Sequence, residues 1–102
     1  MQQETFGSYI RGLREAAGMP LRKLAARLDI DQSTLSKIET NQRYASREMV
    51  PLLAEVFGLD ARELRIKFLS EQILYQIRDE EDGLEALKLA EETINYNKPQ
   101  KQ

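Results

Sequence analysis

Apolar residues recur along this chain every three or four positions, which is the spacing of amphipathic helices. The clearest case lies between residues 21 and 40, where two short stripes are separated by Asp29-Ile30-Asp31. Because that separator is long enough only for a tight turn, two helices must meet at a sharp angle over one small core. The stripes consist of Leu21, Leu24, Ala25 and Leu28 in the first helix, and of Leu35 and Ile38 in the second.

Local signals mark a helix before this pair. Thr5 can cap a helix that extends to about Ala17, because its side-chain oxygen can accept a hydrogen bond from a free backbone N–H. Gly18 suits the C-terminal end of this helix. Pro20 is expected in the first turn of the next helix, where its missing N–H costs nothing. The apolar stripe of the first helix consists of Phe6, Tyr9, Ile10 and Leu13.

Three more helices follow the central pair. A helix that begins near Glu48 and ends at Gly58 places Pro51 in its first turn, whereas an interior proline would cost about 3 kcal/mol. Capping-box patterns then open two further helices, over about residues 60–78 and 82–96. The chain is therefore predicted to be all-α.

The helix predicted over residues 32–40 leaves only small or hydrogen-bonding side chains on its outer face. A helix with such a face can enter the major groove of DNA, where Gln can bond adenine and Lys can bond guanine. Asp31 is expected to cap this helix and not to contact DNA. The predicted base-reading residues are Gln32, Ser33, Ser36 and Lys37.

The stretch from about Phe6 to Leu64 resembles the helix-turn-helix domain of the lambda-repressor and Cro type, also named after the xenobiotic response element. The resemblance rests on the segments LREAAGM, LAARLDI, STLSKIE and MVPLLAEVFGLD. It implies a five-helix DNA-binding domain, here assigned to residues 1–69. A C-terminal helical extension is expected over residues 70–97, and a frayed tail over 98–102.

Three positions depart from the family pattern. Asp29 stands where the turn usually has Gly, and Asp tolerates the left-handed conformation better than most residues. Leu21 stands where the family often has a Gln that meets a phosphate. Glu39-Thr40-Asn41 replaces the pattern E-x-G, and Asn can adopt the left-handed conformation after a helix as Gly does.

The resemblance also implies site residues outside the base-reading face. An arginine at the place of Arg14 pairs with the glutamate that ends the recognition helix, here Glu39. The loop after that helix grips the sugar-phosphate backbone in the family; the alternative is a solvated loop with a packed tyrosine. Arg22 and Lys23 either touch phosphate or merely keep their helix soluble. The predicted backbone contacts are Arg22, Lys23, Asn41, Arg43, Tyr44 and Arg47.

The last third of the chain exceeds what a five-helix domain needs. Its broad apolar stripes require a cover, and a second copy of the chain would supply one. A two-fold dimer would set two recognition helices about 34 Å apart, one turn of DNA. The alternative is that these helices fold back on the chain's own core. The predicted interface consists of Ile66, Leu69, Ile73, Ile77, Leu84, Leu87 and Ile94. Leu64, Phe68 and Leu74 are expected to broaden the apolar stripe of the helix at about residues 60–78.

Composition narrows the classes of function. A chain of 102 residues with 41% hydrophobic and 31% charged residues suits one domain with a modest core. The absence of Cys and His removes thiolate metal sites, the commonest general base and the commonest metal ligand. No catalytic residue, cofactor or metal is therefore expected. Since the chain has no bilayer-spanning apolar run and no signal pattern, a cytoplasmic location without membrane contact is predicted.

Charge is distributed unevenly although the net charge is only −2. The residues up to Arg47 carry about +3 and the remainder about −5. This split suits a basic DNA face with an acidic tail, although ordinary surface scatter would also produce it. The acidic run at residues 79–82 lacks the spacing of an EF-hand, so a solvated turn is expected there and not a cation site.

The leading interpretation is a sequence-specific transcriptional regulator that binds a pseudo-palindromic operator in double-stranded DNA as a homodimer. A stand-alone repressor, a restriction–modification controller and an antitoxin all fit this description. The second class is a protein-interaction module that keeps the fold without the DNA contacts. The polar outer face of the 32–40 helix argues for the regulator.

Overall fold

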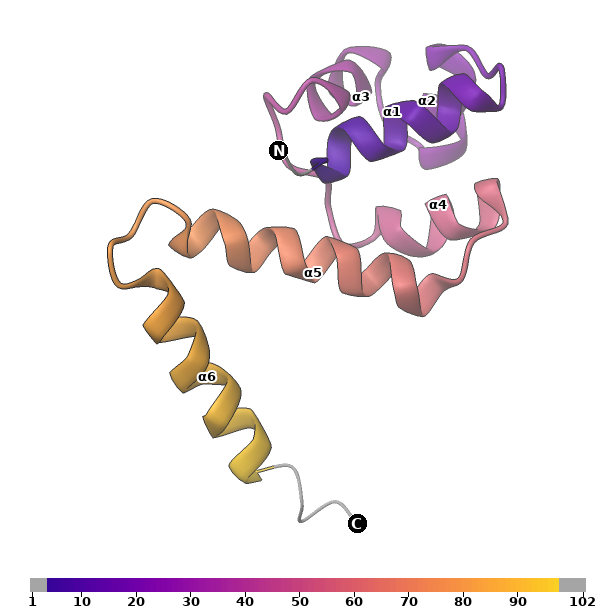
Figure 1. The fold of residues 1–102 in the computed structure, drawn as a ribbon. Coiled ribbons are helices and arrows are strands. Elements are labelled where there is room, and N and C mark those ends of the chain that lie inside the picture. The colour runs from indigo at the N-terminus through magenta and orange to yellow at the C-terminus, as the bar shows by residue number, and fades with distance from the viewer. Residues whose placement is uncertain (1–3, 98–102) are drawn as a thin grey trace. The chain divides into compact units, whose positions relative to one another are not determined.

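A computed structural model describes residues 4–97, which contain six helices and no strand (Figure 1). This confirms the predicted all-α class. The expected frayed tail at 98–102 lies outside the described residues. The helices are α1 (Phe6–Ala16), α2 (Leu21–Leu28), α3 (Gln32–Glu39), α4 (Met49–Phe57), α5 (Ala61–Ile77) and α6 (Gly83–Asn97).

The chain divides into two compact units, the first ending at Glu71 and the second beginning at Gln72. The division falls inside α5, so one continuous helix contributes to both units. The assignment of DNA binding to residues 1–69 and of dimerisation to residues 70–97 stays a prediction.

The first unit is built around a core to which each of the helices α1 to α5 contributes. Within it α3 packs on α1 and α2, and α2 also packs on α4. Burying a single Leu or Phe side chain stabilises a fold by about 1.5–3 kcal/mol, so a core of this size can hold short helices together. The buried apolar residues are Phe6, Ile10, Leu24, Ala25, Leu28, Leu35, Ile38, Met49, Val50, Leu53, Ala54, Leu64 and Phe68.

Three contacts hold the middle of α5 against α1. The rings of Phe6 and Phe68 meet edge to face with centroids 5.6 Å apart. The backbone N–H of Phe6 donates to a carboxylate oxygen of Glu71 at 3.0 Å, which satisfies one of the free donors at the start of α1. The ammonium of Lys67 lies 4.5 Å from the centre of the Tyr9 ring. These contacts attach α5, as far as Glu71, to the rest of the first unit.

The predicted helix ends are confirmed in most cases. Thr5 Oγ1 accepts a hydrogen bond from the Ser8 N–H at 3.1 Å, as expected of a cap. Asp29 and Asn41 adopt the left-handed conformation, with φ of 59° and 66°. The helix with Pro51 in its first turn begins after Glu48, as predicted. Short polar side chains therefore do serve at turns where the family pattern has glycine.

One predicted detail of capping is wrong, and a second is confirmed only in its position. Pro20 is not in the first turn of α2 but precedes it as the N-cap, in an extended conformation with ψ of 153°. Its carbonyl accepts from the Lys23 and Leu24 N–H groups, as the carbonyl of an N-cap residue does. Asp31 is the N-cap of α3, yet its side chain makes no capping hydrogen bond. The exposed carboxylate can remain hydrated while its charge still favours the helix N-terminus.

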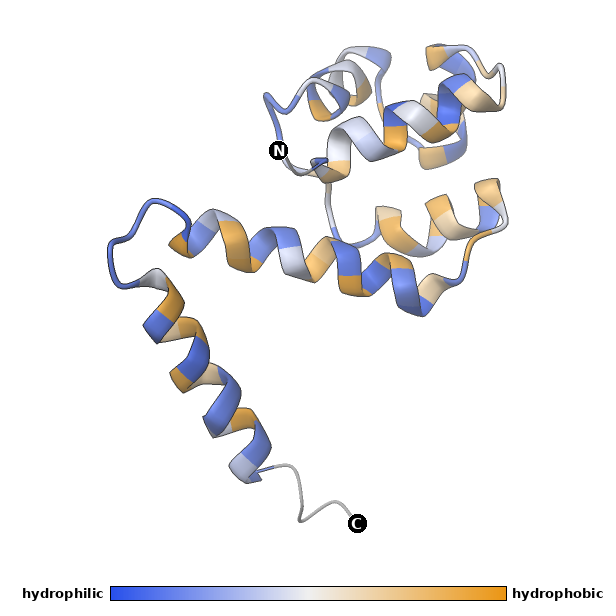
Figure 2. Ribbon diagram, in the orientation of Figure 1, coloured by the Kyte–Doolittle hydropathy of each residue, from blue (hydrophilic) through white to orange (hydrophobic). Residues whose placement is uncertain are grey.

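The prediction of one broad apolar stripe on α5 is also wrong. Leu64 and Phe68, four residues apart, are buried in the core of the first unit. Ile66 and Ile73, seven apart, form a separate stripe that is about half exposed, at 49% and 48%. The helix is thus apolar on two faces, and hydropathy colouring shows orange bands along its whole length (Figure 2). Of the other predicted interface residues, Leu69 packs partly against the core and Ile77 is half-buried.

The second unit comprises the end of α5 and the whole of α6. Gly83 begins α6 and lies so close to Ile77 that a Cβ atom would collide with the Ile77 carbonyl oxygen. This approach fixes the turn between the helices. The large apolar side chains of α6 are exposed within the described chain, namely Leu84, Leu87, Leu89, Ile94 and Tyr96.

Candidate nucleic-acid interface

The helix α3 is presented by a tight turn and held from beneath. Asp29 ends α2 in the left-handed conformation, which lets the chain reverse and start α3 after only two more residues. Leu35 and Ile38 then anchor α3 in the core. Because these two residues occupy the inner side, the opposite side of the helix faces outward.

The four predicted base-reading residues share this outer side of α3. Gln32, Ser33 and Lys37 are exposed, and Ser36 is half-buried. Their spacing of three and four places them as neighbours on the helix surface. The face therefore combines amide, hydroxyl and ammonium groups, the donors and acceptors that read base edges in a major groove.

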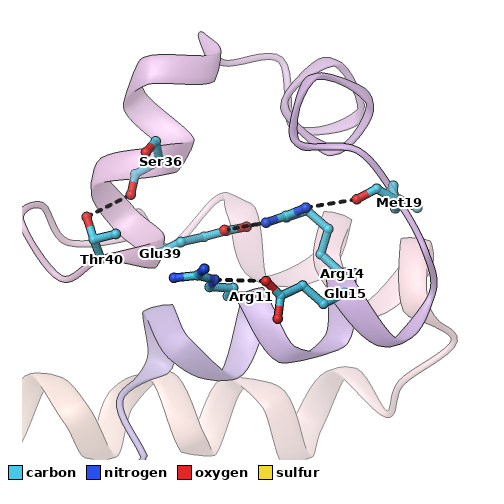
Figure 3. A network of polar contacts seen from close by, with 7 residues as sticks. All are labelled: Arg11, Arg14, Glu15, Met19, Ser36, Glu39 and Thr40. Carbon is cyan, nitrogen blue, oxygen red and sulfur yellow. Dashed lines mark hydrogen bonds and ion pairs between the residues drawn. The ribbon is translucent and has the colours of Figure 1, made fainter.

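Glu39 points from the last turn of α3 toward Arg14 of α1, and the two side chains form a two-pronged ion pair (Figure 3). Arg14 Nε donates to one carboxylate oxygen at 2.8 Å and Nη2 donates to the other at 3.0 Å. The third guanidinium nitrogen, Nη1, donates to the carbonyl of Met19 at 2.9 Å. One arginine thus joins α1, the segment before α2, and the end of α3.

The Arg14–Glu39 pair is enclosed, with side-chain exposures of 14% and 4%. Among the described residues, no buried side-chain nitrogen or oxygen lacks a hydrogen-bond partner. The hydrogen bond to Glu39 raises the pKa of the Arg14 guanidinium. Two parallel charge-assisted bonds fix geometry as well as energy, so the pair sets the orientation of α3 on the core.

Gly7 is a second determinant of this orientation, and the sequence interpretation missed it. A Cβ atom at Gly7 would collide with the carbonyl oxygen of Ile38 and crowd Asn41 Oδ1. The backbone of α1 therefore approaches the end of α3 more closely than any side chain would permit. The available signal was a glycine inside a helical pattern, which usually has a packing reason.

The loop after α3 is held at its start by local hydrogen bonds. The Thr40 hydroxyl donates to the Ser36 carbonyl at 2.9 Å, and Gln42 Nε2 donates to Thr40 Oγ1 at 2.9 Å. Arg43 and Arg47 are exposed further along the loop. Tyr44 lies between them in the sequence and is 65% exposed.

The start of α2 supplies the other predicted backbone contacts. Arg22 and Lys23 are exposed there, in the first turn of the helix. Leu21 is half-buried and packs against the core, consistent with its apolar character. The cations thus lie on α2 and on the loop after α3, before and after the polar face in the sequence.

Two other kinds of site receive no support within residues 4–97. No group of three or more acidic side chains is arranged to hold a metal ion in that range. None of the helices described there is long and apolar enough to cross a membrane.

Comparison with known proteins gives one match. A family model described as helix-turn-helix matches residues 10–64. This segment contains α2, α3 and α4, most of α1 and the beginning of α5. No curated protein and no solved structure matches the chain.

Proposed function

Because the chain belongs to the lambda-repressor and Cro-like helix-turn-helix family of DNA-binding proteins, we propose that it is a sequence-specific transcriptional regulator acting in the cytoplasm. In this proposal α3 enters the major groove and reads bases with Gln32, Ser33, Ser36 and Lys37. The single observation that carries it is the outward polar face of α3, held in one orientation by the Arg14–Glu39 pair.

The cations on either side of α3 act on the DNA backbone. Arg22, Lys23, Arg43 and Arg47 are exposed, so their side chains can reach phosphates without first breaking an internal contact. Asn41 and Tyr44 belong to the same loop and would position it. Phosphate contacts fix the protein on the duplex and carry no sequence information directly.

The regulator acts as a homodimer on a pseudo-palindromic operator. The second apolar stripe of α5 and the exposed stripe of Leu84, Leu87 and Ile94 on α6 support this, since such faces need a cover in water. A two-fold axis would let each copy cover the other and would place the two α3 helices about 34 Å apart. A stand-alone repressor, a restriction–modification controller and an antitoxin would each use this arrangement.

Selection from a pool of random duplexes tests the proposal. The full-length protein should enrich an inverted repeat whose half-sites are about 10 base pairs apart from centre to centre. A selected duplex should then bind more tightly than a scrambled duplex of equal length. If the folded protein enriches no sequence, the regulator proposal fails, and the protein-interaction module becomes the better description.

A further inference from the structure

A depression of about 270 Å³ lies at the surface of the first unit, between the start of α4 and the start of α5. It is separate from the outer face of α3, and no residue of α3 lines it. Its lining combines two arginines, one carboxylate and apolar groups, namely Arg47, Glu48, Val50, Pro51, Ala61 and Arg65.

Two guanidinium groups, those of Arg47 and Arg65, line this depression. Within residues 4–97, neither Arg47 nor Arg65 forms an ion pair, whereas Arg11 and Arg14 each pair with a glutamate. A guanidinium presents several donors in a planar fork that matches the oxygens of a phosphate. Two such groups at one concave site therefore favour an oxyanion, in spite of the neighbouring Glu48.

We propose that this depression binds a phosphate of the DNA backbone beyond the groove that α3 enters, and that Arg65 thereby adds α5 to the DNA interface. The inference rests on the proposed function. DNA is the favoured source of the phosphate because Arg47 ends the same loop that carries Arg43. The path of exposed cations thus continues from α3 through the loop and reaches α5 at Arg65.

The charge at Arg65 can be tested against a neighbouring arginine on the same helix. Arg62 is also exposed in the first turns of α5 but does not line the depression. Arg65→Gln should weaken binding to a non-specific duplex about tenfold and reduce the slope of log affinity against log salt by about 0.9, the value of one lost phosphate contact. Arg62→Gln should change both quantities by less than half as much. Equal effects of the two variants would overturn the site.

Removing the carboxylate charge of Glu48 should change duplex affinity in the opposite direction from removing the charge of Arg65. Glu48→Gln removes the negative charge that lines the depression and should strengthen duplex binding several-fold. Glu55→Gln makes the same change on an exposed residue of α4 outside the depression and should have a smaller effect. If Glu48→Gln leaves the affinity unchanged, or strengthens it no more than Glu55→Gln does, no phosphate lies in this depression.

Nuclear magnetic resonance of the arginine Nε–H groups distinguishes the source of the phosphate. Adding a duplex to the full-length protein should shift the Arg65 signal, while millimolar inorganic phosphate should shift it far less. A shift with inorganic phosphate alone would assign the depression to a small anion and overturn the DNA contact. If wild-type protein binds no duplex even at low salt, the proposed function itself fails. Normal wild-type binding with unaltered Arg65→Gln binding would overturn only the inference about α5.

Discussion

At the scale of single residues, the orientation of α3 depends on one ion pair and one glycine. Arg14 joins Glu39 through two hydrogen bonds in a nearly closed environment. Gly7 lets the backbone of α1 approach the end of the same helix. Both features lie on the inner side of α3, so their loss should reduce stability before it alters base preference.

The Arg14–Glu39 pair should respond strongly to removal of either partner. Glu39→Ala or Arg14→Ala leaves a buried charge uncompensated and should cost about 3–5 kcal/mol in the free energy of unfolding. The double variant should cost less than the sum of the single losses, measured by urea denaturation. Strict additivity would show that the two side chains do not interact.

The exposed pair Arg11–Glu15 provides the control for this experiment. Its side chains are more than half exposed, so Arg11→Ala should cost less than about 1 kcal/mol. The raised pKa of Arg14 means that its stabilising contribution is fully present below the ordinary arginine value and is lost only above it. The contribution of Arg14 should therefore not vary around neutral pH.

Two glycines of α1 should respond in opposite directions to the same change. Gly7→Ala inserts a methyl group against the Ile38 carbonyl and should destabilise the fold by about 1–3 kcal/mol. Gly12 has open space around it, so Gly12→Ala should stabilise the helix by about 0.5–1 kcal/mol. Thermal melts of the two variants would measure this, and a Gly7→Ala protein as stable as wild type would contradict the close packing of α1 on α3.

At the scale of elements, the helices were predictable because their signals are local. Caps, left-handed residues and apolar spacing all lie within a few positions of the feature that they specify. The outer face of α3 followed from the same spacing. The two faces of α5 could not be predicted from spacing, since a continuous apolar pattern does not indicate which side meets the core. The close approach of Gly7 and the proximity of Arg47 to Arg65 depend on long-range packing, which spacing does not encode.

The proposed roles of α3 in reading bases and of the following loop in contacting phosphates give a prediction at this scale. Gln32→Ala or Lys37→Ala should cost about 1–3 kcal/mol on the selected operator and relax preference at one or two base pairs. Arg43→Ala or Arg47→Ala should weaken all duplexes together and lower the salt slope by about one unit per lost contact. Binding to operator and scrambled DNA at several salt concentrations separates these outcomes. An unchanged specificity ratio in the first pair of variants would show that α3 does not read the bases.

At the scale of the whole molecule, the apolar stripes of α5 and α6 form the proposed homodimer interface. Leu87 belongs to the predicted interface, whereas Leu89 is exposed elsewhere on α6, two residues away. Leu87→Glu should place a charge in a dimer contact and yield a monomer in sedimentation experiments. It should also lose most operator affinity, because two linked half-sites bind far more tightly than one.

Leu89→Glu is the control, since it makes the same change at a more exposed leucine of the same helix. It should remain a dimer and bind the operator normally. If both variants remain dimeric, the interface lies elsewhere; if both become monomeric, the apolar stripe does not define it. Circular dichroism of each variant would show whether the helices are retained.

The separation between the inner and outer sides of α3 has a consequence for how this regulator can diverge. Leu35, Ile38 and Glu39 secure the helix, and none of them belongs to the face that would touch bases. The outer positions can therefore be exchanged with little effect on folding, since surface substitutions usually change stability by less than about 0.5 kcal/mol. Duplicated copies of such a gene could acquire new target sequences through a few changes at residues 32, 33, 36 and 37, and each intermediate variant would still fold.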